Sequence, residues 1–96
     1  MRILFTPFAR KQFLDALEFI KKDRPAAARE FRDKAETVLR RLAEFPESGR
    51  HLPEFPELPF REVLVPPYRF FYQVKQDDVW IVAAWQDAQL PAPPAP

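Results

Sequence analysis

Residues 60–85 read FREVLVPPYRFFYQVKQDDVWIVAAW, and this stretch decides the fold. Large apolar and polar side chains divide between two sides over residues 68–75, as expected for a β-strand whose two faces differ. The short polar segment 75–78 predicts a hairpin loop. The apolar run 79–85 then predicts a returning strand that is central in the sheet or covered on both faces.

The same stretch predicts a third strand and a face that needs a cover. Residues 60–65 form this strand, and the double proline that follows ends it because proline has no N–H for a ladder hydrogen bond. Tyr68, Phe70 and Tyr72 fall on one side of the next strand. A sheet this small is not stable alone, so we expect the aromatic side to pack against another layer.

Two amphipathic segments near the N-terminus are suited to form that layer. Thr6 and Pro7 make a good helix start, because threonine can cap free N–H groups and proline suits the first helical position. A second helix is expected from about Arg24 to Glu44, with Asp23 as its cap and Phe31 on its apolar stripe. The link between the helices is short, which predicts an antiparallel hairpin.

The predicted order is therefore β-α-α-β-β-β, an α+β fold with a helical hairpin packed on a small antiparallel sheet. Residues 2–5 are expected to join an edge of the sheet. Residues 1–86 are expected to form one domain, and residues 87–96 a loose or polyproline-like tail rich in proline and alanine. In the proline-stiffened loop 46–59, Gly49 is expected to adopt a backbone angle that other residues avoid.

The composition restricts the functional class. The net charge of the 96 residues is +1. Residues 1–50 hold 12 basic against 8 acidic side chains, and residues 51–96 hold 3 against 6. Proteins that bind nucleic acid by neutralising phosphates usually show a stronger basic bias, so we expect no direct sequence-specific DNA binding by this chain alone.

The chain contains no cysteine, which excludes disulfides, a thiolate nucleophile and a cysteine metal site. No paired-histidine spacing or glycine-rich phosphate loop is present, so we expect neither a metal nor a cofactor. No apolar run approaches the roughly 20 residues of a membrane span, and the N-terminus does not resemble a signal peptide. We therefore expect a cytoplasmic protein without a membrane partner.

Three arginines are the main polar candidates for a functional site: Arg50, Arg61 and Arg69. Arginine can hold a phosphate, stabilise developing charge or recognise a partner carboxylate. Cross-strand pairing is expected to bring Arg61 and Arg69 close together. The alternative is that the arginines form salt bridges with nearby glutamates, namely Glu54, Glu57 or Glu62.

Ser48 and His51 are the only serine and histidine, and both fall in the proline-rich loop. Nothing marks the serine as a nucleophile, whereas the histidine keeps a general-base role open as an alternative to a surface position. A second group of candidates is aromatic: Phe71, Trp80 and Trp85. If the second face of the sheet is uncovered, these side chains predict a partner site; the alternative is that the loop or the tail covers it.

Several motifs in this order resemble the RelE/ParE superfamily of bacterial toxins from type II toxin–antitoxin modules. They are the strand followed by Thr-Pro and a helix, the Pro-x-x-Gly-Arg turn at 46–50, and Arg61 followed by Tyr68-Arg69-x-x-Tyr72. The resemblance extends over about residues 2–86. It implies a toxin that an antitoxin neutralises by laying a helical or extended segment across an exposed groove and edge.

The resemblance is closer to ParE-like than to RelE-like members. RelE-like toxins cut mRNA on the ribosome, and His and Arg often follow their final strand. Here residues 85–89 read WQDAQ, without a basic residue or a tyrosine. The resemblance therefore implies a non-enzymatic inhibitor of DNA gyrase, of the kind associated with plasmid stabilisation, whose candidate contacts with antitoxin or target are the three arginines and three aromatic residues named above.

Two alternatives remain open at this point. One is a RelE-like ribonuclease whose partners are the ribosome and mRNA, and whose catalytic candidates are Arg50, Arg61 and Arg69. The other is a non-toxic binding module that has kept the fold.

Overall fold

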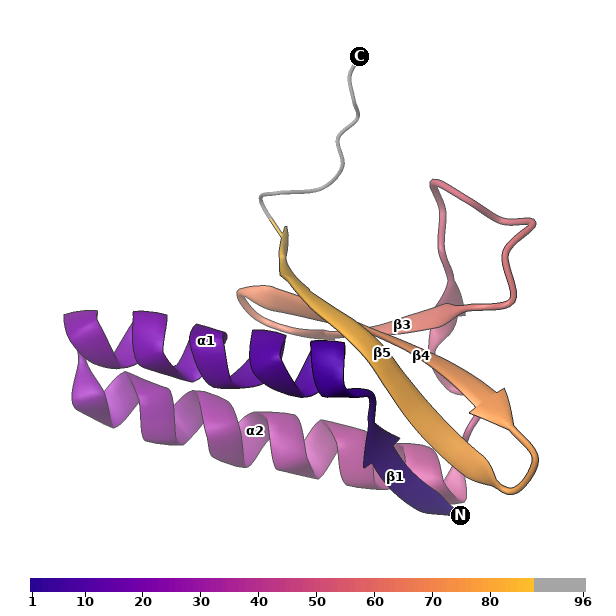
Figure 1. The fold of residues 1–96 in the computed structure, drawn as a ribbon, viewed down its shortest axis with the longest axis horizontal. Coiled ribbons are helices and arrows are strands. Elements are labelled where there is room, and N and C mark those ends of the chain that lie inside the picture. Colours follow the sequence, from indigo (N-terminus) through magenta and orange to yellow (C-terminus); the bar gives the residue numbers. More distant parts are fainter. Residues whose placement is uncertain (88–96) are drawn as a thin grey trace.

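A computed structural model describes residues 1–87; residues 88–96, and with them nearly all of the expected tail, lie outside the described residues. The elements are β1 (Arg2–Phe5), α1 (Pro7–Asp23), α2 (Pro25–Glu44), β2 (Arg50–His51), β3 (Arg61–Val65), β4 (Tyr68–Lys75) and β5 (Asp78–Gln86). The predicted α+β class is confirmed, with the helices side by side next to the sheet (Figure 1). Within residues 1–87, no helix has both the length and the apolar character needed to cross a membrane.

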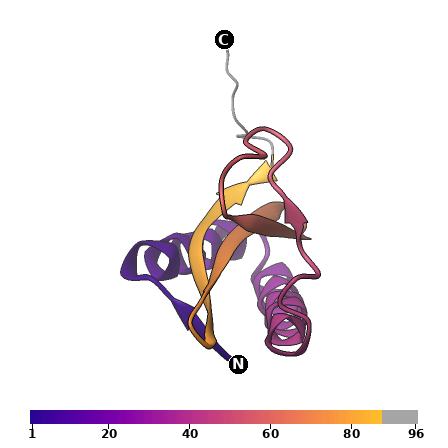
Figure 2. The same cartoon turned by 90° about the vertical axis from the view of Figure 1, so that its right-hand side faces the viewer.

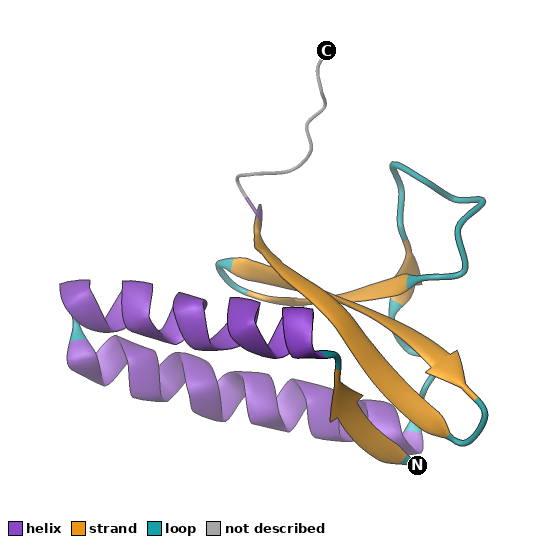
Figure 3. Cartoon of the chain, viewed as in Figure 1, coloured by secondary structure: helices purple, strands orange, loops and turns teal. Residues whose placement is uncertain are grey.

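The five strands form one mixed sheet in the order β1-β5-β4-β3-β2 (Figure 3). The hairpins β3–β4 and β4–β5 are antiparallel as predicted, and β1 joins the sheet edge. β1 runs parallel to β5, a direction that the sequence had not indicated, so the sheet is antiparallel except for this one pair. No short turn joins β1 to β5, so chain connectivity does not impose an antiparallel direction on this pair.

A short strand in the proline-rich loop was not predicted. β2 consists of only two residues, which pair with Glu62 and Arg61 of β3. A strand of this length shows no periodicity, so the pattern of the loop could not indicate it. Figure 2 shows that the part of the loop after β2 extends toward the end of the molecule opposite to the N-terminus.

The predicted N-terminal cap is found at the start of α1 but not at the start of α2. The Thr6 hydroxyl accepts a hydrogen bond from the Ala9 N–H at 3.1 Å, so the predicted cap of α1 is confirmed. The prediction of Asp23 as the cap of α2 is wrong, because Asp23 is the last residue of α1 and Arg24 occupies the cap position without a side-chain cap hydrogen bond. Pro25 removes one of the free N–H groups that a cap would otherwise satisfy.

The core lies between the helical hairpin and the face of β4 that carries Tyr68, Phe70 and Tyr72, as predicted. Phe31 of α2 lies with its ring centroid 5.3 Å from that of Tyr68 and 6.3 Å from that of Phe70. The ring centroid of Phe13 in α1 lies 5.6 Å from that of Phe70. These rings join both helices to the central strands.

A bulge between β4 and β5 changes which side of the sheet the side chains of β5 point to. Phe71 pairs with Ala83 and Tyr72 with Ile81, so Val82 is an extra residue in β5. Beyond the bulge, Trp85 pairs with Arg69 and contacts Phe71 on the side of the sheet that faces away from the helices. The bulge therefore helps to position an aromatic pair outside the core.

Replacing either core ring by alanine tests this packing. Phe31 and Phe70 are 5% and 0% exposed, so Phe31→Ala or Phe70→Ala should lower the free energy of unfolding by about 3–5 kcal/mol. Chemical denaturation of the full chain measures this change. The control is Phe19→Ala on the exposed face of α1, which should change stability by no more than about 0.5 kcal/mol. A loss below about 1 kcal/mol for Phe31→Ala would contradict the assigned packing.

Candidate functional site

A buried carboxylate joins two of the three predicted arginines. Glu62 of β3 is 4% exposed and accepts hydrogen bonds from Arg50 of β2 and Arg69 of β4, with the Arg69 Nε–Glu62 Oε1 distance at 2.7 Å. Arg69 also donates two hydrogen bonds of 3.1 Å to Glu54 in the loop. Two positive and two negative side chains thus form one network that ties the loop to the sheet.

The pKa values in this network follow from its contacts. The hydrogen bond from Arg69 is the largest effect on Glu54 and holds the pKa of that carboxyl below its ordinary value. Burial alone would lower the pKa of Arg69, but its hydrogen bonds to Glu54 and Glu62 outweigh burial and raise it. Both groups are therefore charged at neutral pH, as an ion-paired network requires.

The third arginine occupies a different place. Arg61 Nη1 donates to the backbone carbonyls of Gly49 at 2.8 Å and Glu47 at 3.2 Å. Its cross-strand neighbour is Tyr72, whereas Arg69 lies opposite Leu64. The prediction that Arg61 and Arg69 meet by cross-strand pairing is therefore wrong, because the register places them three pairs apart.

Tyr72 supports the turn that leads into β2. Its hydroxyl donates to the Pro46 carbonyl at 2.8 Å and accepts from the Gly49 N–H at 2.9 Å. Burial raises the pKa of Tyr72 above its ordinary value, so the hydroxyl keeps its proton for this hydrogen bond. The side chain thus belongs to the core through its ring and to the turn through its oxygen.

Gly49 is needed at this turn for space. The prediction that it adopts an unusual backbone angle is wrong, because its φ is not positive. A Cβ atom at this position would lie 2.5 Å from the Tyr72 hydroxyl oxygen and 2.7 Å from the Glu62 carbonyl oxygen. The side chain of any other residue would therefore push the turn away from the sheet.

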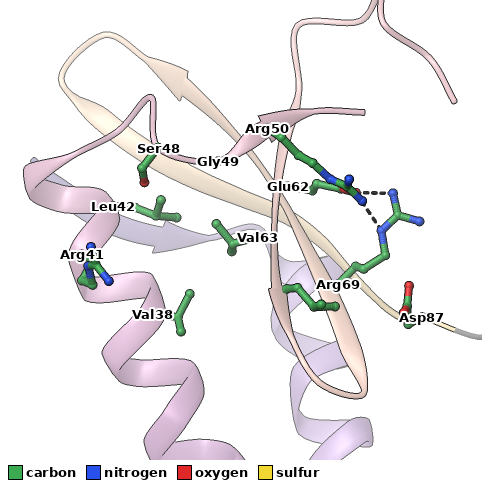
Figure 4. Close-up of a pocket in the computed structure, with 11 residues that line it drawn as sticks. Val38, Arg41, Leu42, Ser48, Gly49, Arg50, Glu62, Val63, Arg69 and Asp87 are labelled. Carbon is green, nitrogen blue, oxygen red and sulfur yellow. Dashed lines mark hydrogen bonds and ion pairs between the residues drawn. The ribbon is translucent and has the colours of Figure 1, made fainter. Parts of the chain in front are cut away.

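A cleft of about 590 Å³ opens between α2 and the β3 edge (Figure 4). Its lining comes from Val38, Arg41 and Leu42 of α2, Ser48 and Gly49 of the turn, Arg50 of β2, Glu62, Val63 and Leu64 of β3, Arg69 of β4, and Asp87. Figure 4 shows Arg50 and Arg69 converging on Glu62 at one end of the cleft.

The edge of β3 beside this cleft is only partly covered. β2 pairs with Arg61 and Glu62, and the described strands provide no partner on that side for residues 63–65. Leu64 is 54% exposed within this open segment. An unpaired strand edge next to an exposed leucine is suited to bind an extended segment of another chain.

The three predicted aromatic residues have different environments. Phe71 is only 6% exposed, because loop residues and Trp85 cover it. Trp85 is 38% exposed, and its ring centroid lies 4.9 Å from that of Phe71. Trp80 is partly buried on β5 and lies outside this pair. The loop thus covers part of the second sheet face, which was one of the two alternatives for it.

Other expectations concern titratable groups and metals. Ser48 lines the cleft, and His51 is exposed on β2. Within residues 1–87, no cluster of three or more His, Cys, Asp or Glu side chains is arranged to hold a metal ion.

The alternative that the arginines form salt bridges with nearby glutamates is confirmed for Arg50 and Arg69, since both bind Glu62. Sequence reasoning placed Tyr72 on the core face but missed its contact with the glycine turn, because the two positions are 23 residues apart and no local pattern connects them.

Comparison with known protein families identifies one family. A family model described as the ParE toxin of the type II toxin-antitoxin system parDE matches residues 3–91. No curated protein matches the chain in sequence. The fold resembles a solved chromosomal ParDE toxin–antitoxin system from P. aeruginosa, with a TM-score of 0.73, 17% identity, and coverage of 90% of this chain and 95% of that chain.

A conserved hypothetical protein from Helicobacter pylori is also similar, with 17% identity and coverage of 94% of this chain and 98% of that chain. Its TM-score of 0.45 is too low to support a conclusion about the fold.

Adding a methyl group at the turn tests its fit against the sheet. Gly49→Ala should destabilise the protein by about 1–3 kcal/mol because the new Cβ overlaps Tyr72 and backbone. Thermal or urea unfolding measures this loss. The neighbouring exposed residue provides a control, since Ser48→Ala should stay within about 0.5 kcal/mol of the wild type. Equal stability of the two variants would show that the turn has room for a side chain.

The lowered pKa of Glu54 predicts a pH dependence of stability. Its contribution should be complete above the ordinary carboxyl value of 4.5 and should disappear as the pH falls through its lower folded-state pKa. Glu54→Gln should therefore lose less stability than the wild type on acidification, as measured by urea unfolding at a series of pH values. Glu57→Gln, in the same exposed loop, is the control. Parallel curves for the wild type and Glu54→Gln would argue against the ion pair with Arg69.

Proposed function

Because the chain belongs to the ParE toxin family of type II toxin–antitoxin systems, we propose that it inhibits DNA gyrase and that a cognate antitoxin neutralises it. The match of the family model to residues 3–91 is the observation that carries this proposal. We assign the toxin domain to residues 1–86 and place the protein in the bacterial cytoplasm, where it would meet gyrase.

The geometry of the arginines supports inhibition by binding over RNA cleavage. Arg69 is buried between Glu54 and Glu62, and Arg50 shares Glu62 with it. Cleavage of RNA requires positive charge that is free to stabilise a developing phosphate charge. The charges of Arg50 and Arg69 are instead directed at carboxylates, and Arg61 holds the turn through backbone carbonyls.

The exposed parts of this region are the proposed contacts with gyrase. The side chain of Arg50 is 71% exposed although its Nε binds Glu62, and Trp85 is 38% exposed. An arginine and a tryptophan on a rigid sheet are side chains that often dominate the binding energy of a protein interface. The Phe71 ring contacts the Trp85 ring edge-on and would hold it in position for this interface.

The open β3 edge is the proposed position of the antitoxin. An extended antitoxin segment can pair with residues 63–65 while an apolar side chain packs against Leu64 and Val38 in the cleft. Such an arrangement satisfies the backbone groups of the free edge, which otherwise risks pairing with unrelated strands.

Expression of the full chain in bacteria tests the proposed target. Induction should produce filamentous cells with damaged DNA and intact transcripts, and the purified chain should inhibit supercoiling by gyrase. Codon-phased transcript cuts with intact DNA would instead establish a ribosome-dependent ribonuclease. Normal growth with folded protein present would contradict the toxin function and support the non-toxic binding module.

A substitution at the open edge tests the proposed antitoxin position. Leu64→Lys should leave the fold and toxicity intact because Leu64 is exposed, but it should weaken binding of the cognate antitoxin by about tenfold or more, as expected for an interface anchor. Co-expression rescue and direct titration measure this effect. The control is Leu14→Lys on exposed α1. Equal rescue of both variants would place the antitoxin elsewhere.

A further inference from the structure

One polar side chain lies on the inner side of α1. Gln12 comes one turn after Ala9 and one turn before Ala16, and both of these alanines are buried in the core. The Gln12 Oε1 atom accepts a hydrogen bond of 2.7 Å from the Ala84 N–H of β5. A polar group removed from water needs such a partner, so the position of Gln12 is tied to that of β5.

The Ala84 N–H lies where β5 has passed the end of its neighbour β1. β1 pairs with β5 only as far as Ile81. The Thr6 N–H still donates to the Ile81 carbonyl at 3.0 Å, and the chain then turns into α1 beside β5 (Figure 1). Gln12 of that helix therefore supplies the acceptor that a longer β1 would have offered to this edge of β5.

The end of β5 has few other attachments. Beyond Ile81, β4 is the strand that pairs with it, and the pairs include Ala84 with Phe70 and Trp85 with Arg69. A strand end with one neighbouring strand opens more easily than a segment that is paired on both edges. The hydrogen bond from Gln12 joins this end to the helical layer, on the side opposite to β4.

The same end of β5 carries a functional candidate and one wall of a second cavity. Val82, Ala83 and Trp85 line an apolar groove of about 220 Å³ on the sheet face that points away from the helices. Loop residues, among them Phe55 and Leu58, line it as well. A displacement of the end of β5 would therefore move the indole ring and change the shape of this groove.

We propose that Gln12 is a positioning residue, whose amide oxygen holds the end of β5 against α1 and thereby fixes the place of Trp85. The hydrogen bond to Ala84 lies on the edge of the strand, one residue before the tryptophan. This positioning does not depend on the target of the protein. Its effect on gyrase binding rests on the proposed function, in which Trp85 is a contact.

Nuclear magnetic resonance of the full chain tests the positioning. Gln12→Met keeps the length of the side chain and removes the oxygen acceptor. It should make hydrogen exchange of the Ala84 amide about tenfold faster relative to the core amides of β4, and weaken the nuclear Overhauser contact between Trp85 and Phe71. Gln12→Glu keeps an acceptor oxygen and should preserve both signals. Ile20→Ala, at a partly buried position elsewhere on α1, is the control for a general loss of stability and should change neither signal.

Two results would overturn the positioning role. One is a folded Gln12→Met variant in which the relative exchange of Ala84 and the contact between Trp85 and Phe71 are unchanged, since β4 alone would then hold the end of β5. If Gln12→Met does not fold, the wild type decides. A scalar coupling across the hydrogen bond, between the Ala84 nitrogen and the Gln12 side-chain carbonyl carbon, supports the proposal, and its absence overturns it.

Binding to purified gyrase tests the link to Trp85. Gln12→Met should weaken binding by no more than Trp85→Ala does, and the double variant should bind as Trp85→Ala does, because Gln12 acts through the tryptophan. Additive losses would overturn this link. If the wild-type chain does not bind gyrase, the proposed function fails, while the resonance measurements still decide whether Gln12 positions Trp85.

Discussion

The Glu62 carboxylate between Arg50 and Arg69 is the interaction on which the outer half of the structure depends. It joins β2, β3 and β4, and through Arg69 it also holds Glu54 of the loop. Leaving a buried charge unpaired is costly, so each member of the network restricts the positions of the others. A loop rich in proline and poor in regular structure thereby acquires a fixed place on a small sheet.

This network also separates two surfaces of different chemistry. On one side lies the cleft between α2 and the free edge of β3, which offers unpaired backbone and charged side chains. On the other side lies the apolar groove with Phe71 and Trp85. Arg69 contributes to both walls, so a partner at one surface contacts the same side chain that supports the other. One side chain of β4 therefore takes part in the walls of both the cleft and the apolar groove.

The sequence was informative where periodicity and local chemistry determine structure. The hairpin around residues 75–78, the Thr6 cap and the aromatic face of β4 followed from patterns a few residues long. Features that depend on contacts across the chain were not predictable in this way. The direction of β1, the two-residue β2, and the contact of Tyr72 with the turn at Gly49 each depend on residues distant in sequence. The three arginines were found as candidates, but their partners depended on strand register.

The pairing of β1 with β5 has a consequence for how the protein is made. Arg2 of β1 pairs with Asp78 of β5. The backbone of β1 is made first, but it can pair only after β5 has been made. Contacts with such a large sequence separation form slowly relative to helices and hairpins. The helical hairpin can assemble during synthesis, while β5, which lies between β1 and β4 in the sheet, is the last of these strands to be made. The sheet of a nascent chain therefore cannot close at the β1 edge until residues 78–81 have been made.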